Sequence, residues 1–317
     1  DGKTKYTRGQ GSPALCEAVA NHLMKTSNIS VSPENVLITP GAKQALLYSY
    51  MTVLNPGDEA ILLSPSWASY EPMISIIGGV PVNVPVDRKN FHPDMDAIRS
   101  SITNRTRMIM VNSPCNPTGA VYTREEIEEI VSIAIEHDLW IISDEIYSRL
   151  IWNGGEHVSP ATIEGGKERT IVISGWSKTW AMTGMRVGFL AGPEQAVRAA
   201  VKCQANSASH IPTFMMEAAR VALDCDDHVE RFSDAYRQRR KLMVQGLEDI
   251  PGLRIVNPEG AFYLFIDVSG TGMSDVQFAD GALEAGVQLI PASLITGGEG
   301  FIRVSYAASE EDIKEGI

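Results

Sequence analysis

The feature that most constrains the fold of this chain is the alternation of short apolar runs with helical segments between about residues 14 and 225. Such runs, each of a length suited to one strand, occur at residues 36–39, 60–63, 80–84, 108–111, 140–143, 171–173 and 187–190. Residues 123–137, between two of these runs, begin like a helix, with Thr123 as N-cap and Glu126 at the capping-box position. Nearly all-apolar strands are typical of parallel sheets that helices cover on both faces. The pattern therefore predicts an α/β fold with a mainly parallel central sheet flanked by helices.

The pattern of apolar and charged residues changes after about residue 225. A long charged helix is expected over residues 228–248, followed by a helix near residues 274–285. Strand-like apolar runs occur at residues 262–266, 287–290 and 301–305. We therefore expect a large domain over residues 1–225 and a smaller C-terminal α+β domain over residues 226–317.

Composition and charge narrow the classes of function. The net charge of −12 argues against a nucleic-acid partner, because phosphate backbones require a basic surface. No run of apolar residues is long enough to span a membrane, and no signal peptide is expected. The 4 cysteines form no Cys-x-x-Cys pair, so neither a metal site nor a disulfide framework is predicted. A reducing, cytoplasmic location is the simplest expectation.

Lys178 lies among small residues in the segment 174–188, directly after one apolar run and before another. A lysine in such a place can form a Schiff base with an aldehyde, while Arg186 and nearby hydroxyls hold a phosphate. The segment therefore indicates an attachment site for pyridoxal 5′-phosphate (PLP). The alternative is an exposed lysine at the end of a strand.

A PLP site also needs an anion for the pyridine nitrogen and a donor to the ring oxygen. Ligands of parallel sheets bind at the carboxyl ends of the strands, so residues directly after each apolar run are the candidates. Asp144 follows the run 140–143 and is the candidate anion; the alternative is the N-cap of a helix. Tyr147 is the candidate donor; the alternative is a core tyrosine.

Segments after three other apolar runs contain candidates for ring binding, ring stacking and phosphate binding. Asn116 lies in the loop 112–119, which could instead be a plain turn. Trp67 follows the run 60–63 and could stack on a planar ring or belong to the core. The turn at Gly41 precedes a helix whose free N–H groups would suit a phosphate, although any helix start has this property.

In this order and spacing the motifs resemble the class-I PLP-dependent aminotransferases of fold type I, in the branch that includes prokaryotic aspartate aminotransferases. The matching segments cover nearly the whole chain: Tyr6-Thr7 with Gly11, residues 41–46, 55–59, 65–67, 112–119, 143–147, Ser177-Lys178 with Arg186, residues 260–263 and residues 303–306. The resemblance implies that Lys178 binds the cofactor and moves a proton at the substrate Cα. It implies that Asp144 pairs with the pyridine nitrogen.

The resemblance also implies roles for the other matching positions. Tyr147 and Asn116 would bond the ring oxygen, and Trp67 would stack on the ring. The phosphate would be held by Gly41, the amides of Ala42 and Lys43, Ser177 and Arg186. Arg303 would bind the α-carboxylate of the substrate, with Asn116, Trp67 and Lys43 beside it. Tyr6 would reach into the site of a neighbouring subunit, so a homodimer with shared active sites is implied.

The function implied is ping-pong transamination between an L-amino acid and a 2-oxo acid. Lys43 resembles a lysine near the distal carboxylate in the aspartate branch, which favours aspartate with 2-oxoglutarate. Donors of the aromatic, alanine or methionine type are alternatives. A lyase on the same scaffold and a PLP-binding regulatory module are less favoured.

The chain departs from the family pattern in three places. Gly175 replaces a common phosphate-binding serine, so that Ser174 or Ser177 would have to compensate. The loop 291–296 differs from the usual pattern on the substrate side. The N-terminal segment of the family and the last helix are expected to be missing.

Overall fold

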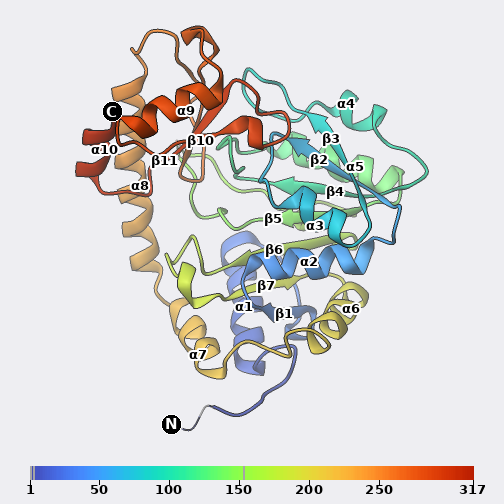
Figure 1. Cartoon of the computed structure of the whole chain (residues 1–317). Coiled ribbons are helices and arrows are strands. Elements are labelled where there is room, and N and C mark those ends of the chain that lie inside the picture. The colour runs from blue at the N-terminus through green and yellow to red at the C-terminus, as the bar shows by residue number, and fades with distance from the viewer. Residues whose placement is uncertain (1, 3, 153) are drawn as a thin grey trace.

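The computed structural model describes residue 2, residues 4–152 and residues 154–317. A seven-stranded sheet forms its centre, with strand order β1-β7-β6-β5-β4-β2-β3 (Figure 1). The strands are β1 Val36–Thr39, β2 Glu59–Ser64, β3 Val80–Pro85, β4 Thr106–Asn112, β5 Trp140–Asp144, β6 Thr170–Gly175 and β7 Gly188–Ala191. Strands β3, β2, β4, β5 and β6 are paired in parallel, whereas β7 is antiparallel to both of its neighbours. The prediction of a mainly parallel sheet is confirmed.

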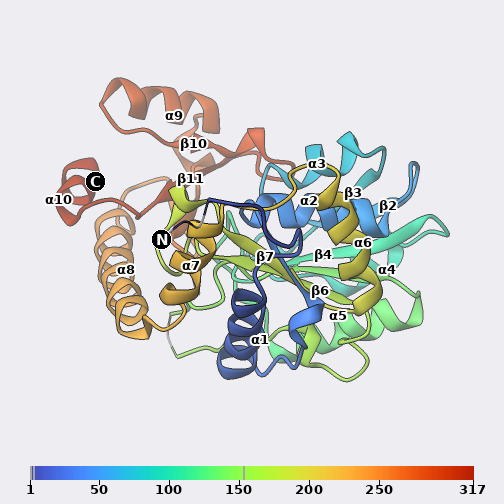
Figure 2. The same cartoon turned by 90° about the horizontal axis from the view of Figure 1, so that it is seen from below.

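Helices cover both faces of this sheet, as the two views show (Figures 1 and 2). They are α1 Pro13–Ser27, α2 Ala42–Val53, α3 Tyr70–Ile76, α4 Met95–Ser100, α5 Arg124–Glu136, α6 Glu194–Ala205 and α7 Thr213–Ala222. Successive residues of one strand enter different cores: Ile141 packs in the cluster beneath α5, and Ile142 packs in the cluster beneath α2 and α6. This double burial explains why the strands are apolar runs rather than alternating patterns.

The C-terminal part begins with α8, Asp226–Leu247, and contains a second sheet that is antiparallel throughout. Its strand order is β10-β11-β9-β8, with β8 Arg254–Ile255, β9 Tyr263–Asp267, β10 Ile290–Pro291 and β11 Phe301–Ser305, and helices α9 Asp275–Glu284 and α10 Glu310–Gly316. The strand predicted over residues 287–290 is wrong except at its last residue. Val287 donates its N–H to the carbonyl of Ala282, in the last turn of α9, so the segment begins by closing the helix terminus instead of pairing in the sheet.

His92 links the loop after β3 to α5 and to the segment before β9. Its Nδ1 lies 2.8 Å from a Glu126 carboxylate oxygen, and its Nε2 lies 3.3 Å from Glu259. The Glu259 carboxylate also accepts the N–H of Val121, at 2.9 Å. The hydrogen bonds to Glu126 and Glu259 raise the pKa of His92 to about 10. The imidazolium therefore joins two acidic groups that would otherwise repel each other.

Replacing His92 with leucine is expected to lower the free energy of unfolding by about 1–3 kcal/mol near pH 6, because two carboxylates lose their partner. The folded-state pKa of His92 is raised, so its contribution is complete below about pH 6.5 and is lost as the pH rises through about 10. Urea unfolding of both proteins across this range would measure the difference. His137→Leu, at a histidine whose Nε2 lies 3.9 Å from Glu136, is the control. A difference that does not shrink at high pH would contradict the assignment.

Candidate active site

A cavity of about 330 Å³ lies at the carboxyl ends of the central strands, where loops from the large sheet meet β9 and β11. It is lined by Ala42, Lys43, Leu46, Trp67, Asn116, Asp144, Ile146, Tyr147, Ser177, Lys178, Thr183, Arg186, Tyr263 and Arg303. Every predicted site residue except Gly41 and Tyr6 is therefore in its wall. Leu46, Ile146, Thr183 and Tyr263 are wall residues to which the sequence assigned no role.

Lys178 follows β6 and projects its amine toward aromatic rings. Its Nζ lies 5.2 Å from the centre of the Phe262 ring and 5.8 Å from that of Tyr147. Burial lowers the pKa of Lys178, and the charge of Arg303 lowers it further, against the opposing charge of Asp144. Because the side chain is partly buried, the alternative of an exposed strand-end lysine is wrong. The lowered pKa makes the neutral amine, which can accept a proton, easier to form.

Asp144 is the last residue of β5 and is only 4% exposed. Its carboxylate accepts a hydrogen bond from Tyr70 Oη at 2.7 Å and one from Ile146 N at 3.2 Å. Burial raises the pKa of Asp144 to about 6, although both hydrogen bonds oppose this rise. No helix follows, because residues 146–149 form a turn, so the helix N-cap alternative is wrong. Tyr70 is a site residue to which the sequence assigned no role, because its hydroxyl reaches Asp144 from a position 74 residues away in the chain.

Gly41 and Arg186 form a cradle at the start of α2. Gly41 has φ of 82°, and a Cβ at this position would lie 2.5 Å from Arg186 Nη2. The main-chain N–H groups of Ala42 and Lys43 are in the first helical turn, where the helix itself provides no acceptor. The positive end of the helix and the guanidinium together suit an anion such as a phosphate.

The absence of a serine at Gly175 has a steric reason. A Cβ at Gly175 would lie 2.8 Å from both Gly188 Cα and Val187 O, so β6 and β7 leave no room for a side chain. Ser174 donates to the carbonyl of Glu145 at 3.4 Å, outside the cavity wall. Of the two candidate substitutes, Ser177 is the one that lines the cavity.

Two cations face the cavity from different walls. Arg303, in β11, donates from Nη1 to Asn116 Oδ1 at 3.0 Å and lies 4.8 Å from the Tyr263 ring centre. Lys43 lies 4.8 Å from the Trp67 ring centre and donates to Ser69, at 3.1 Å. Each of these cations could bind a carboxylate group.

Tyr147 lines the cavity, whereas Tyr6 lies outside it. The Tyr147 hydroxyl lies 2.9 Å from the hydroxyl of Tyr263, in the cavity wall. Tyr6 is 91% exposed and packs edge-on against His210. Its reach into a neighbouring subunit stays a prediction.

The described residues offer neither a metal site nor a membrane span. No group of three or more His, Cys, Asp or Glu side chains in this part of the chain could hold a metal ion. None of the helices seen there has the length and apolar character needed to cross a membrane.

Comparison with known proteins decides the family. All of residues 1–317 match the family model for aminotransferase class I and II. The chain belongs to this family. Its members use PLP and transfer amino groups between amino acids and oxo acids, and the fold of this aminotransferase is fold type I.

Relatives named for different substrates are about equally similar. The chain is 40% identical to the aspartate/prephenate aminotransferase of Thermus thermophilus, over 100% of this chain and 82% of the relative. It is 39% identical to an aromatic-amino-acid aminotransferase of Thermococcus litoralis, over 100% of this chain and 83% of the relative. The solved aspartate aminotransferase from Thermus thermophilus with maleate superposes with a TM-score of 0.95 at 40% identity, over 99% of this chain and 82% of that one.

Gly41→Ala is expected to disrupt the cradle at the start of α2. Positive φ makes the substitution cost about 1–3 kcal/mol of stability, and the new methyl group would also displace the Arg186 guanidinium. Gly57→Ala is the matched control, because Gly57 has φ of 88° but nothing within 4 Å of an added Cβ. Urea unfolding and PLP titration would be measured for both. We expect both variants to lose stability and only Gly41→Ala to lose affinity; equal affinities would contradict the cradle.

Proposed function

We propose that this aminotransferase binds PLP in the cavity at Lys178 and transfers the amino group of aspartate to 2-oxoglutarate. The observation that carries the proposal is a partly buried lysine of lowered pKa in one cavity with a buried carboxylate and an anion cradle. These three groups suit the three parts of PLP: an amine for the aldehyde, a carboxylate for the pyridine nitrogen and a cradle for the phosphate.

The residues that would hold the cofactor lie on separate walls. Arg186, Ser177 and the amides of Ala42 and Lys43 would hold the phosphate. Asp144 would pair with the pyridine nitrogen, and Trp67 would lie against the ring. Tyr147 and Asn116 would bond the ring oxygen. When bound, PLP supplies an electron sink for the bond broken at the substrate Cα.

The protein's own groups supply the proton transfer and the orientation of the substrate. Lys178 Nζ would take the proton from Cα and return it, and its lowered pKa keeps part of the amine neutral. Tyr70 donates to Asp144 and so favours its ionised form. Arg303 would bind the α-carboxylate, with the Asn116 side chain orienting the guanidinium.

Lys43 supports aspartate as donor, because a second carboxylate could bind its amine at the Trp67 wall. The similar relatives include enzymes named for aspartate, prephenate and aromatic amino acids. Aromatic donors are the second candidate, favoured by the rings of Trp67 and Tyr263 in the cavity wall.

A homodimer is also proposed. Tyr6 is 91% exposed and Phe214 is 54% exposed, and neither contributes to the cavity of its own chain. A second copy of the chain would cover such side chains and bring Tyr6 to the neighbouring site. Light scattering of the cofactor-bound protein would measure the mass.

Lys178→Ala is expected to abolish the visible absorption of lysine-bound PLP. It should also lower kcat at least about 100-fold, because the proton-transfer group is lost. Lys202→Ala, at an exposed lysine of α6, should leave both unchanged. Retained transamination by Lys178→Ala would refute the mechanism.

Lys43→Ala keeps the main-chain amide of the cradle and removes only the side-chain cation. It is expected to lower kcat/KM for aspartate about 10- to 100-fold, the loss of one charged hydrogen bond, and to change that for phenylalanine little. A panel of amino donors measured with both proteins would test this. A wild type that prefers aromatic donors would contradict the aspartate assignment, and an equal loss for both donors would contradict the role of Lys43.

A further inference from the structure

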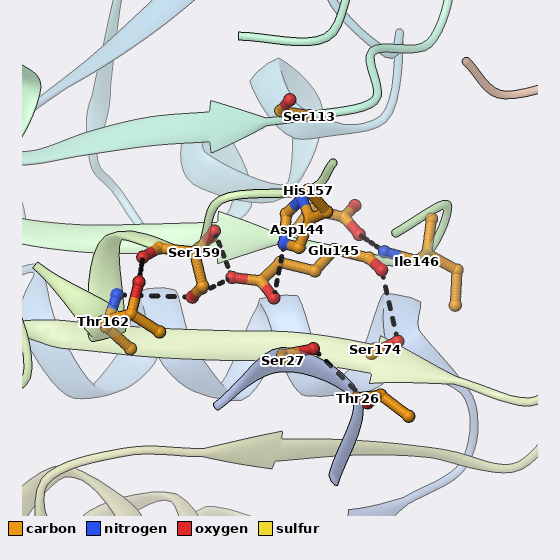
Figure 3. Close-up of polar contacts among 12 residues, drawn as sticks. Thr26, Ser27, Ser113, Asp144, Glu145, Ile146, His157, Ser159, Thr162 and Ser174 are labelled. Carbon is orange, nitrogen blue, oxygen red and sulfur yellow. Dashed lines mark hydrogen bonds and ion pairs between the residues drawn. The ribbon is translucent and has the colours of Figure 1, made fainter. Parts of the chain in front are cut away.

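Glu145 is a buried carboxylate directly after Asp144, and the site described above does not use it. Its side chain is 3% exposed and lies outside the cavity wall. Figure 3 shows its carboxylate between Ser159 and His157, away from the carboxylate of Asp144. Burial of a carboxylate costs free energy unless the group is fully paired. The partners of Glu145 therefore indicate what it does at this position.

Three side chains hold the Glu145 carboxylate. Ser143 and Ser159 donate to Oε1, at 2.9 Å and 2.5 Å. His157, with a side chain only 7% exposed, places Nε2 2.8 Å from Oε2, at ion-pair distance but without the alignment of a hydrogen bond. The residue that follows Asp144 is thus fixed from the segment 157–159 and from β5 itself.

The main chain of Glu145 is fixed as well. Its N–H donates to Ile173 O at 2.8 Å, and its carbonyl accepts from Ser174 Oγ at 3.4 Å and from Ser148 N at 3.0 Å. The two peptide groups that join Glu145 to Asp144 and to Ile146 therefore have little freedom to rotate. Asp144 lies directly before Glu145, Tyr147 lies in the turn directly after it, and both side chains line the cavity. Their directions therefore depend on how the main chain of Glu145 is held.

We propose that Glu145 is a positioning residue, which His157 and Ser159 hold so that the turn aims Asp144 at the cofactor ring. This inference rests on the proposed function. The charge of Glu145 raises the pKa of Asp144 and by itself disfavours the ionised form that pairs with the pyridine nitrogen. The hydroxyls of Ser143 and Ser159 and the imidazole of His157 hold the Glu145 carboxylate away from that of Asp144, so the arrangement fixes the turn while it keeps the two carboxylates apart (Figure 3).

Glu59 provides a matched control at the far end of the sheet. It is 4% exposed, at the start of β2, and its carboxylate is also held by two hydroxyls and a cation: Thr103 at 2.6 Å, Thr106 at 3.1 Å and Arg105 at 2.6 Å. Glu59→Gln removes the same charge from a similar environment. It should lower stability without any effect on the cofactor.

The test is the dissociation constant of PLP for the apo protein, together with its melting temperature. We expect Glu145→Gln and His157→Ala to weaken PLP binding about ten-fold, the size typical of losing a group that orients a ligand. Glu59→Gln should lower the melting temperature by an amount comparable to that of these two variants, but it should bind PLP as the wild type does. His157→Gln should restore binding relative to His157→Ala, because its amide Nε2 can donate from the position of the imidazole Nε2.

Ser159→Ala is the milder variant if Glu145→Gln does not fold, and it should weaken PLP binding in the same direction. Variants at Glu145, His157 and Ser159 that all bind PLP like the wild type would overturn the positioning role. The role is equally overturned if Glu59→Gln weakens binding as much as they do, because the effect would then reflect stability alone. A wild-type protein that does not bind PLP would instead overturn the proposed function and this inference together.

Discussion

The parallel register of the central strands is the constraint on which the site depends. Pairing of β4 with β5 places Asn112 directly beside Asp144, and pairing of β5 with β6 places Asp144 beside Ile173. Asn112 then donates to the Asp144 carbonyl at 3.0 Å and accepts the N–H of Asn116 at 2.9 Å. One side chain therefore fixes both the strand end that carries the carboxylate and the loop that carries Asn116. A slip in register would separate these groups and reverse the faces of their strands.

The charged side chains that line the cavity are mainly positive, although the whole chain is negative. The protein carries a net charge of −12, yet Lys43, Lys178, Arg186 and Arg303 all face one cavity, where Asp144 is the buried acid among the lining residues. Such clustering attracts anionic ligands and also makes the protonated form of the central amine less stable. Besides burial, which is the largest cause, Arg303 and Arg186 lower the pKa of Lys178, and these are the residues proposed to bind carboxylate and phosphate.

Most of the fold and much of the site could be predicted from sequence because their signals are local. Doubly buried strands are apolar runs, and the residues just after them became the cavity wall, as Asp144 and Asn116 show. The antiparallel direction of β7 has no local signal, because its apolar run resembles those of the parallel strands. Tyr70 was missed because only the folding of α3 over the sheet brings its hydroxyl to Asp144. The reason for Gly175 is similarly non-local, since the obstacle is the backbone of β7.

The pKa of Lys178 depends on Arg303, the residue that we propose binds the α-carboxylate of the substrate. The guanidinium charge lowers the pKa of Lys178, and it comes from β11 of the C-terminal sheet rather than from the strand that carries the lysine. A carboxylate bound to Arg303 would neutralise much of that charge and raise the pKa of the amine. The free amine of Lys178 would therefore hold a proton more readily beside a carboxylate-bound Arg303 than beside an unpaired one. Asn116, in the loop after β4, accepts a hydrogen bond from Arg303 and so fixes the position of the charge that lowers the pKa of Lys178.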